Sequence, residues 1–94
     1  LVDGRVARFP DAVTERGLKH LLELRDMVAE GARAVIFFLV QRADAESFGP
    51  ADAIDPAYGA ALREVIAAGV EAMAWQCEVT PEAITLARAL PILL

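Results

Sequence analysis

Cysteine, histidine and long apolar runs are scarce in this sequence, and their scarcity excludes several classes of protein. One cysteine and one histidine among 94 residues supply neither an internal disulfide nor a zinc site of four Cys and His ligands. The longest unbroken apolar run, residues 34–40, is far shorter than the roughly 20 residues that a membrane helix needs. We therefore expect a cytoplasmic protein without a membrane partner, in which Cys77 is a small buried hydrophobe.

Basic residues are also in deficit. The sequence has nine Lys and Arg against fourteen Asp and Glu, and its formal net charge is −5. Phosphate contacts need several cations in one place, so the surface as a whole is poorly suited to nonspecific binding of nucleic acid. Any contact with nucleic acid must therefore come from a local cluster of basic residues. The length and the 56% share of hydrophobic residues fit one small globular domain, or a piece of one.

Signatures of common catalytic sites are missing too. Ser47 is the only serine and has no nucleophile elbow around it, and no glycine loop of the phosphate-binding type is present. Four carboxylates, those of Asp44, Glu46, Asp52 and Asp55, gather in one stretch and could bind a hard cation. No pair of them is fixed on a rigid element, so we prefer a solvated loop and assign no metal ligand in this chain.

The most regular pattern predicts an amphipathic helix over residues 11–30. Its apolar face consists of Gly17, Leu18, Leu21, Leu24 and Val28. Asp11 or Thr14 can cap its start, because either side-chain oxygen can accept a hydrogen bond from a free backbone N–H. Gly31 is well placed to end the helix in a left-handed conformation.

A strand and a second helix follow. Residues 34–40 run without polar alternation, which is typical of a strand that is covered on both faces and lies beside parallel neighbours. Residues 43–55 indicate a loop, after which Asp55 and Pro56 predict the start of a second helix that ends at Gly69. The buried side of this helix is predicted to hold Tyr58, Leu62, Val65 and Ile66.

Hairpins are predicted at both ends of the chain. Near the start, the Asp3-Gly4 turn signal lies between short apolar stubs. Residues 69–79 alternate and predict a half-buried strand, after which residues 80–94 can form a short helix or, as we favour, an edge strand. The buried face of that strand is predicted to hold Met73, Trp75, Cys77 and Val79, with Glu71 on the other face. The order helix, strand, helix, strand with a carboxyl-terminal hairpin predicts an α/β fold with parallel strands joined right-handedly.

Three potential ligands for an anion gather on the polar face of the first predicted helix. Arg16 and His20 are four residues apart, so their side chains lie one above the other, with Lys19 alongside. Such donors can hold a phosphate, and a histidine can also carry a proton near neutral pH. The same residues also fit a solvated face on which Glu23 and Asp26 neutralise the cations, and spacing alone does not decide between the two interpretations.

A second candidate pair, Gln41 and Arg42, lies at the carboxyl end of the predicted core strand. Ligands of open α/β sheets bind in the crevice beyond the carboxyl ends of the strands, so these two side chains are candidates for a ligand contact. Polar residues at the end of a strand also commonly meet only water.

Three stretches of the sequence resemble a known family. They are "FPDAVTERGLKHLLEL", "AVIFFLVQRADAESFGPADAIDPAYGAAL" and the closing "LP", and they are similar to the carboxyl-terminal part of the sugar fermentation stimulation protein family. The resemblance covers nearly the whole chain. It rests on the motifs PDAVTERG-x-KHL, VQR-x-D and DP-x-Y, which occur together and in that order.

The resemblance implies a bacterial or archaeal protein of two domains, an OB-like β-barrel followed by a domain similar to PD-(D/E)XK nucleases. Such proteins are associated with DNA binding and with regulation of maltose-metabolism genes. Residues 1–94 would then be the carboxyl-terminal half of the nuclease-like domain. The family's metal-binding Asp and Glu-x-Lys precede the segment that matches this chain. The resemblance therefore implies that the fragment alone is inactive and that Mg²⁺ binding belongs to the longer protein.

On the same resemblance, Arg16 and His20 look like rim residues that would contact substrate phosphate, with Lys19 beside them. DNA is the expected partner, through the five residues Arg16, Lys19, His20, Gln41 and Arg42. Two alternatives stay open: an active metal-dependent nuclease when full length, and an assembly module whose basic helix face pairs with acidic residues of a partner. Unpaired sheet edges also predict self-association of the fragment.

Overall fold

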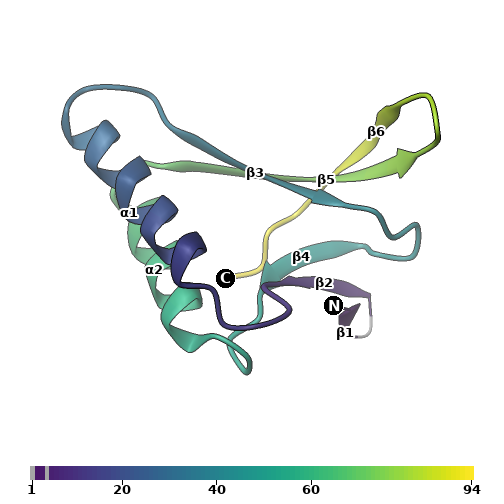
Figure 1. Ribbon diagram of the computed structural model, residues 1–94, viewed down its shortest axis with the longest axis horizontal. Coiled ribbons are helices and arrows are strands. Elements are labelled where there is room, and N and C mark those ends of the chain that lie inside the picture. Colours follow the sequence, from purple (N-terminus) through teal and green to yellow (C-terminus); the bar gives the residue numbers. More distant parts are fainter. Residues whose placement is uncertain (1, 4) are drawn as a thin grey trace.

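Two helices pack side by side against two small sheets in the computed structural model, which describes residues 2–3 and 5–94 (Figure 1). In chain order the elements are β1 (Val2–Asp3), β2 (Val6–Phe9), α1 (Glu15–Ala29), β3 (Val35–Val40), β4 (Ser47–Pro50), α2 (Pro56–Ala67), β5 (Glu71–Val79) and β6 (Ile84–Leu90). One sheet has the strand order β1-β2-β4 and the other has the order β3-β5-β6. The predicted α/β fold is thus confirmed.

Helix α1 begins at Glu15 and not at Asp11, and Thr14, one of the two predicted capping residues, is its N-cap. The Thr14 hydroxyl accepts a hydrogen bond from the backbone N–H of Gly17 at 3.0 Å and so satisfies one of the free donors of the first turn. Leu21 and Leu24 are buried, as predicted for the apolar face. The helix ends just before Gly31, whose φ of +95° is a left-handed conformation that a glycine adopts without steric cost.

Asp55 holds the starts of both helices together. One of its carboxylate oxygens accepts from the Tyr58 N–H at 3.0 Å and caps α2, as predicted. Its other oxygen accepts from the backbone N–H of Thr14, the residue that caps α1, at 2.9 Å. Because Asp55 is 4% exposed, these two hydrogen bonds replace the water that its charge would otherwise bind. Gly69, with a φ of +113°, follows the end of α2.

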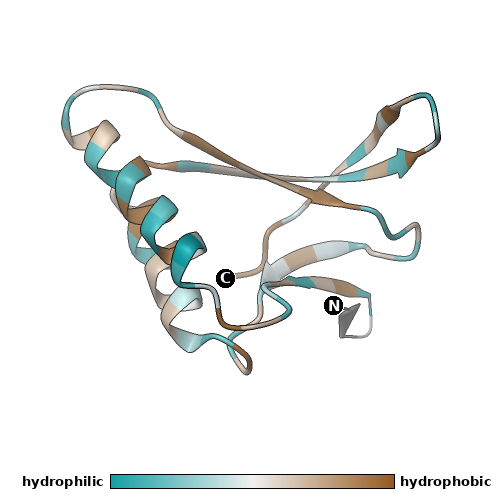
Figure 2. Cartoon of the chain, viewed as in Figure 1, coloured by the Kyte–Doolittle hydropathy of each residue, from teal (hydrophilic) through white to brown (hydrophobic). Residues whose placement is uncertain are grey.

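Strand β3 pairs in parallel with β5, which confirms the predicted parallel strands. The prediction that β3 is covered on both faces is wrong for this chain. Its side chains alternate between buried and exposed, and Val35, Phe37 and Leu39 are 39%, 44% and 48% exposed. Figure 2 shows β3 coloured as hydrophobic along most of its length. The exposure of these three side chains therefore leaves one apolar face of the strand open.

The predicted faces of β5 are also wrong. Ala74 and Gln76, on the face assigned to solvent, are buried, whereas Met73 and Val79 are 43% and 53% exposed. The small side chain of Ala74 allows the two sheets and the helices to pack closely on that side, which the bare alternation of polar and apolar residues does not reveal. Cys77 is buried as predicted, next to a register shift in the pairing with β6.

The segment before α2 contains a strand where the sequence predicted only a loop. Ser47–Pro50 forms β4, which pairs in parallel with β2 and is buried along its length. The end of the chain pairs with the other edge of β4, since Phe48 donates to the Pro91 carbonyl at 2.9 Å and accepts from the Leu93 N–H at 2.7 Å. This long-range pairing forms β4, which has neither the length nor the alternation of an ordinary strand pattern.

Both predicted hairpins are present. Strands β1 and β2 are antiparallel, although Gly4 of the predicted turn lies outside the described residues. Strand β6 returns antiparallel to β5, which confirms the edge hairpin over the short helix. Within the part of the chain that the structure describes, neither helix is long and apolar enough to cross a membrane.

Aromatic rings join the two sheets to α2. The rings of Phe38 on β3 and Phe48 on β4 are stacked with their centroids 4.3 Å apart. Phe9 at the end of β2 lies 5.9 Å from Phe38 and meets Tyr58 edge-on at 5.3 Å. These contacts fix the end of β2 opposite β3, and a pocket lies between these two strands.

Candidate functional site

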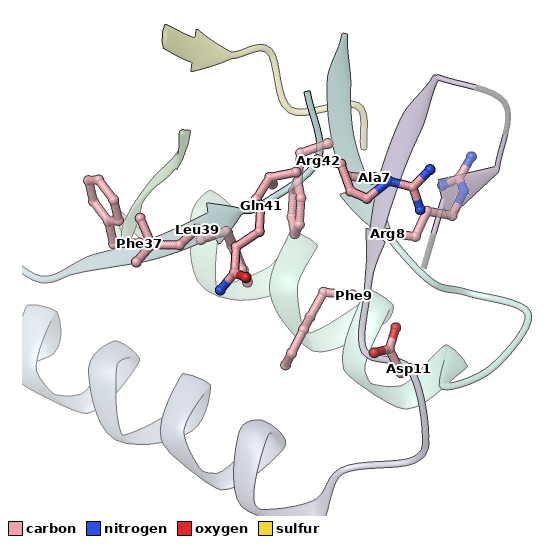
Figure 3. A pocket seen from close by; sticks show the side chains of 11 residues that line it. Ala7, Arg8, Phe9, Asp11, Phe37, Leu39, Gln41 and Arg42 are labelled. Atoms are coloured by element: carbon pink, nitrogen blue, oxygen red, sulfur yellow. The ribbon is translucent and has the colours of Figure 1, made fainter. Parts of the chain in front are cut away.

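A pocket of about 320 Å³ lies between β2 and the carboxyl end of β3, and Figure 3 shows it from close by. Its walls are formed by Ala7, Arg8, Phe9, Asp11, Phe37, Phe38, Leu39, Val40, Gln41, Arg42 and Phe48. The structure therefore places both predicted strand-end residues, Gln41 and Arg42, at one pocket. Its floor of phenylalanines and its polar rim can contact a ligand with both apolar and charged parts.

Arg42 does not present a bare positive charge to this pocket. Its guanidinium donates two hydrogen bonds to the Asp44 carboxylate, at 3.1 and 3.0 Å, and both side chains are exposed. This hydrogen bonding raises the pKa of Arg42 and lowers the pKa of Asp44. An anion that binds Arg42 must compete with this carboxylate, so Arg42 is a less favourable phosphate ligand than its position in the sequence indicates.

Arg16, Lys19 and His20 are exposed on α1, as predicted. They do not line the pocket that contains Gln41 and Arg42. The structure thus separates the five predicted residues into two groups, one on the helix and one at the end of β3.

The charge pairing across the molecule distinguishes the helix cations from the other basic residues. In the described part of the chain, salt bridges join Arg5 with Glu46, Arg25 with Asp26 and Glu64, Arg33 with Glu71, Arg42 with Asp44, and Arg63 with Asp52. Arg88 and Arg8 donate to carbonyl oxygens, those of Ala45 and Pro50. Among the described residues, Arg16 and Lys19 are the two Lys or Arg side chains without a hydrogen bond or ion pair.

The alternative in which carboxylates of α1 neutralise the cluster is therefore not seen. Asp26, one of the two carboxylates considered for that role, lies 3.6 Å from Arg25. Arg16 and Lys19 are left available for an anion that comes from outside the described part of the chain.

Sequence reasoning missed the side chains that hold the loop behind Gln41 and Arg42. Gln76 on β5 donates to the Arg42 carbonyl at 2.8 Å and accepts from the Nε–H of Arg88 at 2.8 Å. Arg88 on β6 also donates to the Ala45 carbonyl at 2.6 Å. The signal for this network was the glutamine between Trp75 and Cys77 in the middle of the strand, because a buried amide needs partners for both its donor and its acceptor.

The acidic stretch before α2 does not form a metal site. Within residues 2–3 and 5–94, no group of three or more His, Cys, Asp or Glu side chains converges closely enough to hold a metal ion. Asp52 instead forms two hydrogen bonds with Arg63, at 2.9 and 2.8 Å, and Asp55 caps α2. These carboxylates instead stabilise the fold, and the segment is not the solvated loop that the sequence predicted, because β4 and Asp55 are buried.

Comparison with known proteins places the chain in a family. The family model described as the Sugar fermentation stimulation protein RE domain matches residues 1–83. The chain belongs to this family, SfsA. That relationship confirms the resemblance inferred from the motifs, whereas which part of an SfsA protein the chain represents stays a prediction.

Curated relatives are 50% to 60% identical to this chain over the matched residues. The sugar fermentation stimulation protein homologue of Geobacter sulfurreducens is 59% identical over 93 residues, which cover 99% of this chain and 40% of the relative. The homologue of Pelobacter propionicus is 60% identical over 94 residues, which cover 100% of this chain and 41% of the relative. The chain thus spans about 40% of the length of the relatives that it matches.

A solved SfsA structure has the same fold. The Pyrococcus furiosus SfsA, solved in complex with Ca²⁺, superposes on the whole of this chain with a TM-score of 0.91 and 29% sequence identity. The match covers 41% of that protein. The α/β arrangement described above is therefore part of a larger structure in this relative.

Proposed function

We propose that this chain is the carboxyl-terminal part of a DNA-binding, nuclease-like regulator associated with sugar metabolism. In this function Arg16 and Lys19 contact DNA phosphates, and His20 adds a third donor on the same helix. Gln41 and Arg42 contact the nucleic acid at the neighbouring pocket. The binding is to the backbone and is largely independent of sequence, because the proposed contacts are to phosphate and not to base edges.

The observation that carries this proposal is the absence of partners for Arg16 and Lys19 in the described part of an acidic chain. The other seven Lys and Arg side chains already donate to carboxylates or carbonyls of the protein. An exposed cation with no internal partner forms a charge-assisted hydrogen bond with phosphate without first breaking another contact. The local basic surface on α1 therefore supports phosphate binding despite the negative net charge.

The experiment measures binding of a short fluorescent DNA duplex by anisotropy over a series of salt concentrations. We expect Arg16→Ala and Lys19→Ala each to weaken binding several-fold and to reduce the slope of log K against log[salt] by about 1. Arg25→Ala is the matched control, because Arg25 lies on the same helix but is 3.3 Å from Glu64. Equal effects of Arg16→Ala and Arg25→Ala would contradict the proposal.

The Ca²⁺ in the Pyrococcus furiosus structure favours a second candidate function, a metal-dependent nuclease in the full-length protein. Two-metal and one-metal nucleases use carboxylate ligands to hold Mg²⁺, and the described residues of this chain do not converge on such a site. The metal ligands of this candidate function must then come from outside the 94 residues, and no catalytic step follows from the residues present.

Cleavage of plasmid DNA with and without Mg²⁺ or Mn²⁺ distinguishes the two functions. It is measured for this chain and for a protein extended upstream, with Arg16→Ala and His20→Ala in the longer form. Cutting by the extended protein alone, slowed by these substitutions, supports the nuclease. Binding without cutting under every metal supports the regulator, and a change of oligomeric state in Arg16→Ala without a change in DNA affinity supports an assembly module.

A further inference from the structure

One face of the β3-β5-β6 sheet carries a row of exposed apolar side chains. In the parallel register of β3 and β5, Phe37 lies beside Met73 and Leu39 lies beside Trp75. Phe37, Leu39 and Met73 are 44%, 48% and 43% exposed, and Trp75 is half-buried. These four residues, here called the outer patch, point away from the core, since the alternate residues Phe38 and Ala74 are buried.

The four side chains of the outer patch carry no charge, although Phe37 and Leu39 also line the edge of the pocket that contains Arg42. The next pair in the register, Val35 and Glu71, contains the nearest charge in these two strands, and Glu71 accepts a hydrogen bond from Arg33 at 3.0 Å. The pairing with Arg33 lowers the pKa of Glu71 and keeps its charge balanced. The outer patch is thus a contiguous group of exposed apolar side chains, and the charge beside it is balanced by an ion pair. Such surfaces are typically covered by another protein segment.

The sequence of β3 agrees with a covered outer patch. All six residues of the strand, Val35 to Val40, are apolar, which is typical of strands buried on both faces. The inner face is buried here by the helices and the other sheet, whereas the outer face has no cover among the described residues. A strand that needed only one buried face would carry polar residues at alternate positions.

We propose that the outer patch is covered, in the longer protein, by residues of the same polypeptide that lie outside these 94. The lengths of the relatives support this occupant. The Pyrococcus furiosus SfsA has this fold over only 41% of its chain, and the curated relatives are matched over 40% to 41%, so more than half of each polypeptide is available. A covalently linked segment acts at an effective concentration of roughly millimolar, which favours it over a second copy at micromolar concentration.

Oxidation of methionine by dilute peroxide tests this proposal in the longer protein, because the chain has two methionines with nearly equal exposure in the structure described here. Met73 belongs to the outer patch and is 43% exposed, and Met27 on α1 is 46% exposed and serves as the internal control. We expect Met73 to be oxidised at least ten times more slowly than a free methionine peptide, at a rate independent of protein concentration. A rate within three-fold of the free peptide would overturn the proposal. Protection that disappears on dilution would also overturn it, because it would identify a second copy as the cover.

A substitution provides a second measurement with a different readout. Phe37→Lys in the longer protein is expected to lower the melting temperature by roughly 5 °C or more, because it places a charge in a covered apolar surface. The matched control is Val13→Lys, at a loop position that is 71% exposed. Equal melting temperatures of the two variants would contradict an intramolecular cover. Neither measurement depends on DNA binding, so failure of this inference is distinct from failure of the proposed function.

Discussion

Replacement of Asp55 is expected to destabilise the protein more than any exposed carboxylate would. Its carboxylate caps α2 through the Tyr58 N–H and reaches 41 positions back along the chain to the Thr14 N–H. Asp55 is 4% exposed, so water does not readily replace it in either hydrogen bond. Two backbone donors at the starts of the two helices depend on this one side chain.

The expected loss of stability can be estimated from the two hydrogen bonds that Asp55 accepts. Loss of an N-cap costs about 0.5–2 kcal/mol, and a hydrogen bond to a charged group contributes about 1.5–3 kcal/mol. Part of the stability lost with these two hydrogen bonds is regained, because the variant no longer has to desolvate a buried carboxylate. We therefore expect Asp55→Ala to lower the free energy of unfolding by about 2–4 kcal/mol. Asp55→Ser, which keeps a capping oxygen but is too short to reach Thr14, is expected to cost about 1–2 kcal/mol less than Asp55→Ala.

Urea unfolding followed by circular dichroism measures these differences. Asp26→Asn is the control, because Asp26 is an exposed carboxylate 3.6 Å from Arg25 and such pairs contribute about 0–1 kcal/mol. If Asp55→Ala were no more destabilising than Asp26→Asn, Asp55 would not hold the helix starts together. If Asp55→Ser matched the unsubstituted protein, the hydrogen bond to Thr14 would contribute nothing.

Three further predictions concern a titration, a close contact and an association. Burial, and the charge of Asp55, raise the pKa of Tyr58 to about 12, so folding is expected to lose stability as pH rises from about 10, where the unfolded tyrosine ionises, towards 12. Tyr58 is the only tyrosine, so its ultraviolet titration in native buffer and in denaturant checks the shift directly, and coincident curves would refute it. Gly49→Ala is expected to destabilise by roughly 1–3 kcal/mol in urea unfolding, because a Cβ there would lie 2.9 Å from the Leu93 carbonyl oxygen. The cost should shrink in a chain shortened by residues 91–94, and an equal cost in both would point to another cause. The isolated chain is expected to self-associate at micromolar concentration through its strand edges, since β3 and β6 each pair with one other strand in the described sheet, and a sharp monomer mass in sedimentation would contradict this.

Local chemistry predicted those elements whose signals lie close together in the sequence. Thr14 and Asp55 are capping residues followed by helix-forming segments, and the start of each helix depends on a contact within three residues. Gly31 and Gly69 ended the helices as predicted because the left-handed conformation is a property of the single residue. The exposure of Arg16, Lys19 and His20 followed in the same way from helical periodicity.

Elements that depend on distant partners could not be predicted. Strand β4 exists because β2 lies along one of its edges and the end of the chain along the other. The buried face of β5 contains Ala74 and Gln76, and the latter is buried because Arg88 and the Arg42 carbonyl satisfy its amide. The ion pairs of Arg42 with Asp44 and of Arg63 with Asp52 also depend on how the segment between β3 and α2 folds. Spacing in the sequence therefore did not reveal which basic side chains lack an ion pair.

The negative net charge and the proposed phosphate contacts are compatible because binding depends on where unpaired charges lie. Five of the arginines are balanced by carboxylates within the fold, so they contribute little to an external field beyond roughly 10 Å at physiological salt. The electrostatic field of the unpaired acidic residues is screened over the same distance. A phosphate at α1 therefore responds mainly to Arg16, Lys19 and the carboxylates nearest to them. Removal of a distant carboxylate charge should change its affinity far less than removal of either cation.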